Sequence, residues 1–318
     1  MTSASSPTLS RAFVTRRLHS LMGIWLVLFL MEHLIVNSQA ALLIGDDGMG
    51  FVRGVQSIRD LPYLPVIEIV LLAFPFLIHA VWGIHYAMTS KSNSFASDGS
   101  TPSLTDYPRN RAYTWQRITS WILLVAIAAH VIHMRFIEYP TTVQRDSQEY
   151  YVVRISDDLG LRTLAARLGV QLYDSAKIQE QKNLLPLKPS TNPLESSAGS
   201  QLKEQSALQE QHWVNALERR PLDAHQLVAV SKSFGMAELL MVRNTFKNPW
   251  MILLYTLFVG FACFHAFNGL WTSFIRWGIT LSEYSQDLMR KVSWFLMLLI
   301  GFLGLAAIWG TYWINLKH

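Results

Sequence analysis

The sequence is poor in cysteine and in charge. Of its 318 residues, one is a cysteine, Cys263, and 15% are charged. A single cysteine excludes an intramolecular disulfide, a cysteine-ligated zinc site and a cysteine-bound iron–sulfur cluster within this chain. Soluble domains carry about 25% charged residues, most of them on the solvated surface. The low share here argues against an ordinary soluble protein.

What the sequence has instead is long apolar runs. Hydrophobic residues make up 51% of the chain and gather in blocks that are nearly free of charge. A helix needs about 20 apolar residues to cross roughly 30 Å of hydrocarbon. We therefore predict an all-α membrane protein with a bundle of five transmembrane helices. The five blocks are roughly Leu21–Ile44, Val66–Met88, Ile118–Phe136, Trp250–Phe274 and Val292–Ile314.

A long polar segment separates the third block from the fourth. It divides the chain into helices 1–3 (residues 1–138), an extramembrane insert (139–248) and helices 4–5 (249–318). The insert is rich in Gln, Glu, Ser and Lys in its middle. Ile155–Leu172 and Leu222–Phe246 have helical apolar spacing, so we expect the insert to be irregular or helical. The sequence assigns it no chemistry.

Basic residues flank the spans unevenly. The N-terminal segment carries Arg11, Arg16 and Arg17 and no acidic residue, and the second and fourth connections carry further Lys and Arg. The positive-inside rule then places the N-terminus in the cytoplasm and the insert and C-terminus outside. This explains the net charge of +5 better than nucleic-acid binding does. A cleaved signal peptide is the alternative for the first block, but Glu32 and His33 inside the run argue against it.

Four of the predicted spans contain a histidine at membrane depth. Ionisable residues there are costly and are functional candidates by default. His33 and His130 come late in helices that run outward, whereas His79 and His265 come late in helices that run inward. Each pair therefore joins two helices at one level, as the two axial imidazoles of a haem require. Hydrogen-bonded core histidines are the alternative interpretation.

Two glycines and one further histidine bear on this prediction. Gly83 and Gly269 each lie four residues after a candidate ligand, on the same helical face, where a small residue leaves room for a flat macrocycle. Close packing of helices is the alternative reason for them. His133, one turn beyond His130, is an alternative ligand. The other histidines are expected to be solvated or to reach toward water: His85, His212, His225 and His318.

A polar cluster lies near the inner ends of the spans. Haem propionates are carboxylates, and buried carboxylates need cationic or hydrogen-bonding partners. Some of the arginines are alternatively topology signals alone. The candidate propionate partners are His19, Ser20, Gln116, Arg117 and Arg276.

Several segments resemble the cytochrome b558 subunits of bacterial succinate dehydrogenase, a family of single-chain, five-helix, dihaem anchors. The resemblance extends over all five spans in their order, but not over the insert. The segments are Arg16-Arg17-Leu18-His19-Ser20-Leu21-Met22-Gly23, Glu32-His33-Leu34-Ile35-Val36-Asn37, Pro75–Gly83, Trp115-Gln116-Arg117-Ile118-Thr119, Phe264–Trp271 and Arg276–Thr280.

The resemblance implies two b haems, with His79 and His265 holding the one nearer the cytoplasm and His33 and His130 the other. His130 is favoured over His133 because the family motif is His followed by Val. The family also implies two partners on the basic cytoplasmic face, a flavoprotein carrying FAD and an iron–sulfur subunit. Electrons would pass through both haems to a membrane quinone, expected to be menaquinone, in the bacterial cytoplasmic (inner) membrane.

Three other functions remain open. The chain is alternatively a structural anchor that has lost its haems, although all four ligand positions are histidine. A dihaem cytochrome of another quinone-linked dehydrogenase is a second alternative, although the motifs resemble those less. A transporter or channel with a histidine proton relay is the third, but it would be expected to have broken helices and paired carboxylates.

Overall fold

The computed structural model describes residues 10–43, 45–89, 104, 107–185, 197–219 and 221–314. These residues form two compact units, which are treated separately. The first, here called the bundle unit, comprises Met1–Ile35, Pro62–His130 and Leu254–Leu305. The second, the insert unit, comprises Val36–Leu61, Val131–Leu253 and Ala306–His318.

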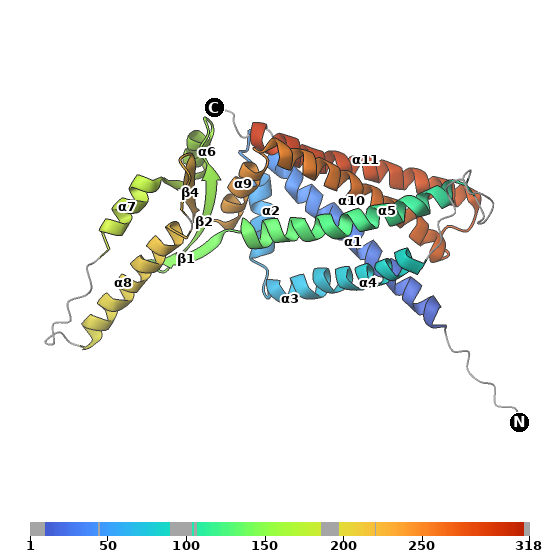
Figure 1. The fold of residues 1–318 in the computed structure, drawn as a ribbon, viewed down its shortest axis with the longest axis horizontal. Helices are drawn as coiled ribbons and strands as arrows, with labels where there is room; N and C mark the ends of the chain where they lie inside the picture. Colours follow the sequence, from blue (N-terminus) through green and yellow to red (C-terminus); the bar gives the residue numbers. More distant parts are fainter. Residues whose placement is uncertain are drawn as a thin grey trace, which may run out of the picture. The chain divides into compact units, whose positions relative to one another are not determined.

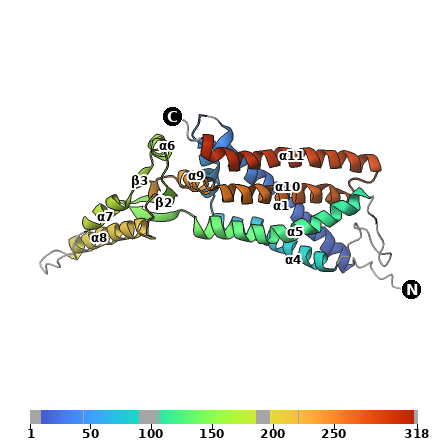
Figure 2. The ribbon, with the colours of Figure 1, turned by 45° about the horizontal axis from the view of Figure 1, so that its top comes forward.

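Five helical segments are long and apolar enough to cross a membrane, which confirms the predicted spans. Figures 1 and 2 show the last two of them lying side by side. The spans are built from α1 (Arg11–Leu42), α3 (Leu64–Glu68) with η1 (Ile69–Ala73) and α4 (Phe74–Thr89), α5 (Pro108–Val131) with η2 (Ile132–Ile137), α10 (Pro249–Arg276), and α11 (Glu283–Ile314).

The spans expose large apolar side chains along their length. Val81, Val125 and Leu298 are 59%, 71% and 65% exposed. Water would solvate such continuous apolar surface poorly, whereas hydrocarbon solvates it well, and a helix satisfies its own backbone groups there. The chain is a multi-pass membrane protein.

A proline inside the second span is accommodated by a side chain from the first. Pro75 has no N–H and cannot donate to the carbonyl of Leu71, four residues earlier. The backbone just before it widens into the π-helical segment η1. The indole Nε1–H of Trp25 donates to that carbonyl, with an N···O distance of 2.5 Å. Because an unsatisfied carbonyl is costly in hydrocarbon, this bond stabilises the span eight residues before His79.

Helices α1, α10 and α11 approach closely at Gly304. A Cβ there would lie 2.8 Å from Val259 Cγ1 and 3.2 Å from Leu34 Cδ1. Val259 and Leu34 are both buried. Small residues permit such close contacts between membrane helices, where packing is a main source of association.

The insert unit contains a four-stranded antiparallel sheet with the order β1-β2-β4-β3. Asp146 and Ser147 both have positive φ and form the two-residue turn between the first two strands, with Arg145 opposite Gln148. Such turns match the twist of a hairpin. The strands are β1 (Thr141–Arg145), β2 (Gln148–Ser156), β3 (Gln171–Tyr173) and β4 (Gln226–Ser231).

Helices cover both faces of this sheet, as Figures 1 and 2 show. On one face, Val152 and Val228 pack with Trp213 of α8 in a buried core. On the other, α9 packs against β2 and against α2. The helices of the unit are α2 (Met49–Arg59), α6 (Leu161–Leu168), α7 (Ser175–Asn183), α8 (Ser197–Leu217) and α9 (Phe234–Thr245).

The expectation of an irregular or helical insert is only partly met, because the sheet was not predicted. Helices α6 and α9 do lie within the two ranges with helical spacing, but Ile155 belongs to β2 and Gln226–Ser231 forms β4. Five of the six β4 residues are buried. A strand covered on both faces lacks the apolar–polar alternation by which strands are recognised.

A buried ion pair joins α9 to the loop after β2. Arg243 donates two hydrogen bonds to Asp158, of 2.8 and 2.7 Å, and the two side chains are only 2% and 8% exposed. Lys247 Nζ adds contacts to the Asp157 carbonyl at 2.8 Å and to the Asp158 carboxylate at 3.4 Å. Burial raises the pKa of Asp158, but the hydrogen bonds and charge of Arg243 outweigh it, so its pKa lies below the ordinary value.

Other contacts within the insert unit involve segments adjoining the spans. Arg167 of α6 forms a two-pronged ion pair with Asp47, which follows α1, at 2.8 and 2.9 Å. Helix α9 crosses α2 so closely that a Cβ at Gly235 would lie 2.5 Å from the Val52 carbonyl oxygen. Residues of the insert therefore contact the segment between the first two spans as well as being joined to the third and fourth spans by the chain.

Candidate functional site

The bundle unit brings the four span histidines together as two pairs. The ring centroids of His79 and His265 are 6.3 Å apart with an angle of 84° between the planes. Those of His33 and His130 are 6.1 Å apart with an angle of 77°. A metal–imidazole bond is about 2 Å and the centroid lies about 1 Å further, so two imidazoles on opposite sides of one metal would have centroids about 6 Å apart. Both pairs have this spacing.

Hydrogen bonds at Nδ1 orient both rings of the His79–His265 pair. His79 Nδ1 lies 3.0 Å from the His19 carbonyl oxygen, which can only accept, so this nitrogen carries the proton. His265 Nδ1 lies 3.1 Å from Thr119 Oγ1, whose own proton is directed at the Trp115 carbonyl 2.8 Å away. In both rings Nε2 is then the nitrogen with a lone pair for a metal.

Aromatic side chains surround the His33–His130 pair. Phe29 stacks on His33 with centroids 5.5 Å apart, and Phe258 lies 5.5 Å from the His130 ring. The hydroxyl of Tyr255 is 3.2 Å from His130 Nδ1. The His33–His130 pair therefore has aromatic surroundings. Its His130 has a polar partner at Nδ1, as His79 and His265 do.

His19 is a buried polar side chain beside the His79–His265 pair. It stacks on His79 with centroids 4.1 Å apart and 13° between the planes. Neither of its ring nitrogens has a hydrogen-bond partner among the described residues, and both are buried. Leaving such a group unsatisfied costs about 1–3 kcal/mol. A polar group from outside the polypeptide fits here, and a haem propionate is one.

Other predicted propionate partners lie at the same level. Ser20 is buried and its hydroxyl accepts a hydrogen bond from Trp277 Nε1 at 3.3 Å. Arg276 Nη1 lies 3.4 Å from the Arg16 carbonyl, and its guanidinium is near enough to His19 for their charges to interact. The structure thus brings His19, Ser20 and Arg276 to one end of the bundle.

Gln116 is engaged by the neighbouring helix. Its Nε2 donates to the His265 carbonyl at 2.9 Å, and its Oε1 accepts from Asn268 Nδ2 at 2.6 Å. A Cβ at Gly269 would lie 3.0 Å from this Nε2, so the glycine permits the close approach of α5 and α10. These contacts hold the backbone that carries His265, and they do so without a bound cofactor.

Three other predicted positions are Gly83, Arg117 and His133. A Cβ at Gly83 would make ordinary contact, 3.5 Å, with His19 Nε2. The Arg117 guanidinium lies 5.1 Å from the ring of Tyr113 on its own helix. His133 lies in η2, beyond the ring that pairs with His33. The roles of these residues as ligands or cofactor contacts remain predictions.

Sequence reasoning missed three residues that touch the pairs: Thr119, Tyr255 and Gly23. A Cβ at Gly23 would lie 2.8 Å from His79 Cε1. Gly23 follows His19 by four residues, the spacing already noted for Gly83 and Gly269, so this repeat could have revealed it. Thr119 lies in one of the segments that carry the resemblance, but it was given no role, and nothing in the sequence alone marks Tyr255.

The donor set fits a haem better than a bare ion. No group of three or more His, Cys, Asp or Glu side chains that could hold a metal ion occurs in the part of the chain that the structure describes. Two imidazoles fill only two positions around a metal, and a porphyrin supplies the four in its plane. Each histidine pair comes from two facing helices and would supply the two imidazole ligands, leaving the other four positions to a porphyrin.

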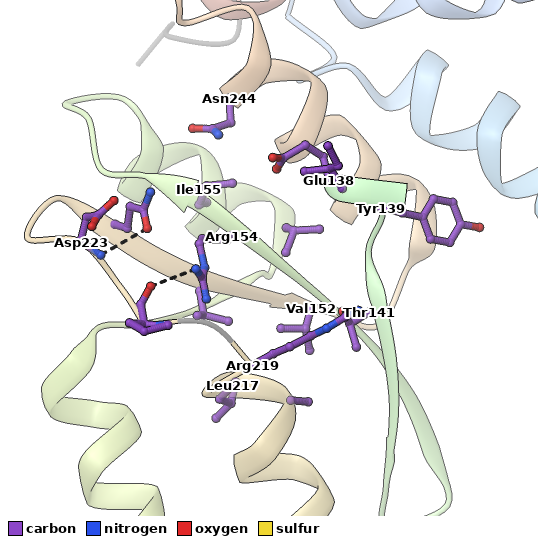
Figure 3. A pocket seen from close by; sticks show the side chains of 16 residues that line it. Glu138, Tyr139, Thr141, Val152, Arg154, Ile155, Leu217, Arg219, Asp223 and Asn244 are labelled. Atoms are coloured by element: carbon purple, nitrogen blue, oxygen red, sulfur yellow. Dashed lines mark hydrogen bonds between the residues drawn. The ribbon is translucent and has the colours of Figure 1, made fainter. Parts of the chain in front are cut away.

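The insert contains a separate hollow of about 260 Å³ (Figure 3). Two arginines line it, and the insert itself binds both. Arg154 donates to the Pro221 carbonyl at 3.0 Å, and Arg219 donates to Thr141 Oγ1 at 2.6 Å. We therefore assign no ligand to this hollow.

Comparison with known proteins gives one informative match. No family model and no solved structure matches the chain. The succinate dehydrogenase cytochrome b558 subunit of Bacillus subtilis (strain 168) is 23% identical over 300 residues. The resemblance is confirmed. The matched range covers 94% of this chain and 96% of the relative, so it spans the insert as well as the five helices, whereas the motif segments had extended the resemblance to the helices alone.

Proposed function

We propose that this chain is the dihaem cytochrome b anchor of a membrane-bound succinate:quinone oxidoreductase. The relative that it resembles is named a succinate dehydrogenase subunit and a cytochrome b558. The observation that carries the proposal is the spacing of the two histidine pairs, 6.3 and 6.1 Å between ring centroids.

In this proposal, His79 and His265 bind the haem nearer the cytoplasm, and His33 and His130 bind the haem nearer the outside. Bound haem supplies one-electron iron chemistry. His19, with Ser20 and Arg276 at the same level, provides hydrogen bonds and positive charge for the propionates of the first haem. Gln116, Arg117, Gly83 and Gly269 remain further candidate contacts.

The two histidine pairs lie at different levels of the bundle. His19, which stacks on His79, and His33 are 14 positions apart on α1, a rise of about 21 Å. Electrons from succinate would arrive through an FAD-bearing flavoprotein and an iron–sulfur subunit, and would leave to a quinone, menaquinone, near the outer pair. This chain itself would not bind succinate.

The proposed location is the bacterial cytoplasmic membrane. The N-terminus lies in the cytoplasm with Arg11, Arg16 and Arg17, and the insert and C-terminus lie outside. The basic face then serves as the docking surface for the two soluble partners. On this basis the functional division is 1–138 and 249–318 for the haem bundle and 139–248 for the insert.

Purification of the complex tests this proposal. We expect two haems b per chain by pyridine haemochrome assay, together with succinate-dependent reduction of a menaquinone analogue. A preparation without haem would favour the structural anchor. A dihaem preparation that oxidises formate or hydrogen but not succinate would favour a different dehydrogenase.

Substituting Gly23 with alanine is expected to weaken haem binding at His79 and His265. The new Cβ would lie 2.8 Å from His79 Cε1 and 3.1 Å from its Nδ1, so the ring must move and its bond to the His19 carbonyl must weaken. The haem content of the purified variant should fall from two toward one per chain.

Gly260→Ala provides the matched control for this variant. It makes the same substitution in another span, where a Cβ would meet no heavy atom of the described residues within 4 Å. It should keep both haems. Equal haem content in the two variants would show that close contact at Gly23 does not position His79.

A further inference from the structure

A single helix, α10, contributes to both histidine pairs. It carries His265, a member of one pair, and ten residues earlier it carries Tyr255, whose hydroxyl lies 3.2 Å from Nδ1 of His130 in the other pair. Ten residues correspond to about 15 Å along the helix. The Tyr255 ring also meets the His130 ring, with centroids 5.7 Å apart and 72° between the planes.

The direction of this hydrogen bond decides whether His130 can bind a metal through Nε2. A neutral imidazole has one N–H and one lone pair. If the tyrosine donated to Nδ1, then Nε2 would carry the proton and could not be a ligand. If the tyrosine oxygen accepts from Nδ1–H, then Nε2 has the lone pair. The latter arrangement has the same proton position as His79 and His265, whose Nδ1 atoms face a carbonyl and a threonine hydroxyl.

We infer that Tyr255 is a positioning residue for the outer haem: its hydroxyl oxygen accepts the Nδ1 proton of His130 and thereby sets the redox potential of that haem. This rests on the proposed function, because it requires iron between His33 and His130. An acceptor at Nδ1 increases the basicity of the imidazole and so stabilises the oxidised iron. The Nδ1 partners of His79, His265 and His130 are a carbonyl, a threonine hydroxyl and a tyrosine hydroxyl. Because these groups differ in acceptor strength, the redox potentials of the two haems can differ.

The substitution Tyr255→Phe tests the inference in the full complex. It keeps the ring that packs on His130 and on Phe258, 6.0 Å away, and removes only the acceptor oxygen. Potentiometric titration of the haem absorbance should show the outer component shifted to higher potential. We expect about a tenfold change in its oxidised-to-reduced equilibrium, which is about 59 mV for a one-electron couple. The inner component should not move.

Thr119→Val is the matched control. It removes the acceptor from His265, with no change at His130, so it should shift the inner component and leave the outer one. Tyr255→Gln, which restores an acceptor, should return the outer potential toward the original value. If Tyr255→Phe does not accumulate in membranes, comparing Tyr255→Gln with Tyr255→Leu asks the same question, and only the leucine variant should shift.

The results separate this inference from the proposed function. An unsubstituted complex without haem would overturn the function. A complex with two haems in which Tyr255→Phe moves neither component, or moves both equally, would overturn only the role of Tyr255. Selective loss of the outer haem in Tyr255→Phe would support that role, since the ligand would then depend on the hydroxyl for its orientation.

Discussion

Replacing His265 with alanine should leave a protein that binds one haem instead of two. The substitution removes one of two imidazoles whose centroids lie 6.3 Å apart, and His79 alone offers a single axial ligand. The other pair lies at a different level and shares neither residue, so its haem should remain. Pyridine haemochrome stoichiometry and a reduced-minus-oxidised spectrum of the purified complex measure both effects.

His85→Ala is the control for this experiment. His85 is an exposed histidine on α4, the helix that carries His79, and it belongs to neither pair. The control should keep two haems. If His265→Ala also kept two, or if it lost both while the chain still accumulated in the membrane, the assignment of His79 and His265 to one haem would be wrong.

Replacing Arg243 with methionine should destabilise the insert by about 3 kcal/mol. Methionine fills much of the space but leaves the Asp158 carboxylate buried, 8% exposed, without its two strongest hydrogen bonds. Lys247 Nζ, 3.4 Å from the Asp158 carboxylate, still offsets part of its charge. The expected loss of stability is therefore at the low end of the range for broken buried ion pairs. Proteolysis of the detergent-solubilised full chain in increasing urea measures the change as a lower midpoint for cleavage within 139–248.

The charge on Asp158 makes this loss dependent on pH. Because its pKa is held below the ordinary value in the folded protein, the ion pair contributes fully above the ordinary aspartate pKa of about 4. Its contribution decreases as the pH falls below that value. The difference between Arg243→Met and the original chain should therefore be large at pH 7 and smaller near pH 3. The double variant Arg243→Met with Asp158→Asn should be less destabilised than Arg243→Met alone, and equal losses would show that the buried charge is not the cause.

The spans and the levels of the histidines could be predicted because both depend on local sequence. About twenty apolar residues are the length that a membrane-crossing helix needs, and a constant rise per residue converts position into depth. That is why His79 and His265 could be matched before their helices were placed side by side. Tyr255 and Thr119 were missed for the opposite reason. Their partners are more than 100 positions away in the chain, and only helix packing selects them.

The Trp25–Leu71 hydrogen bond shows the same limit. The proline at position 75 predicts that the carbonyl four residues earlier lacks its usual donor. It does not say which side chain will supply one, because that depends on how α1 crosses the second span. The sheet of the insert escaped prediction for a related reason. A strand as uniformly buried as β4 resembles a short buried helix until the surfaces that cover it are known.

The strand order of the insert has a consequence for biogenesis. Strand β2 pairs with β1 on one edge and with β4 on the other, and residues 157–225 separate β2 from β4 in the chain. During synthesis, β2 therefore presents an open edge until β4 has been made, and open edges recruit foreign strands. Only α9 lies between β4 and α10 in the chain, so the strand that completes the sheet is made shortly before the fourth span. We therefore expect a nascent chain that stalls before β4 to be prone to aggregation.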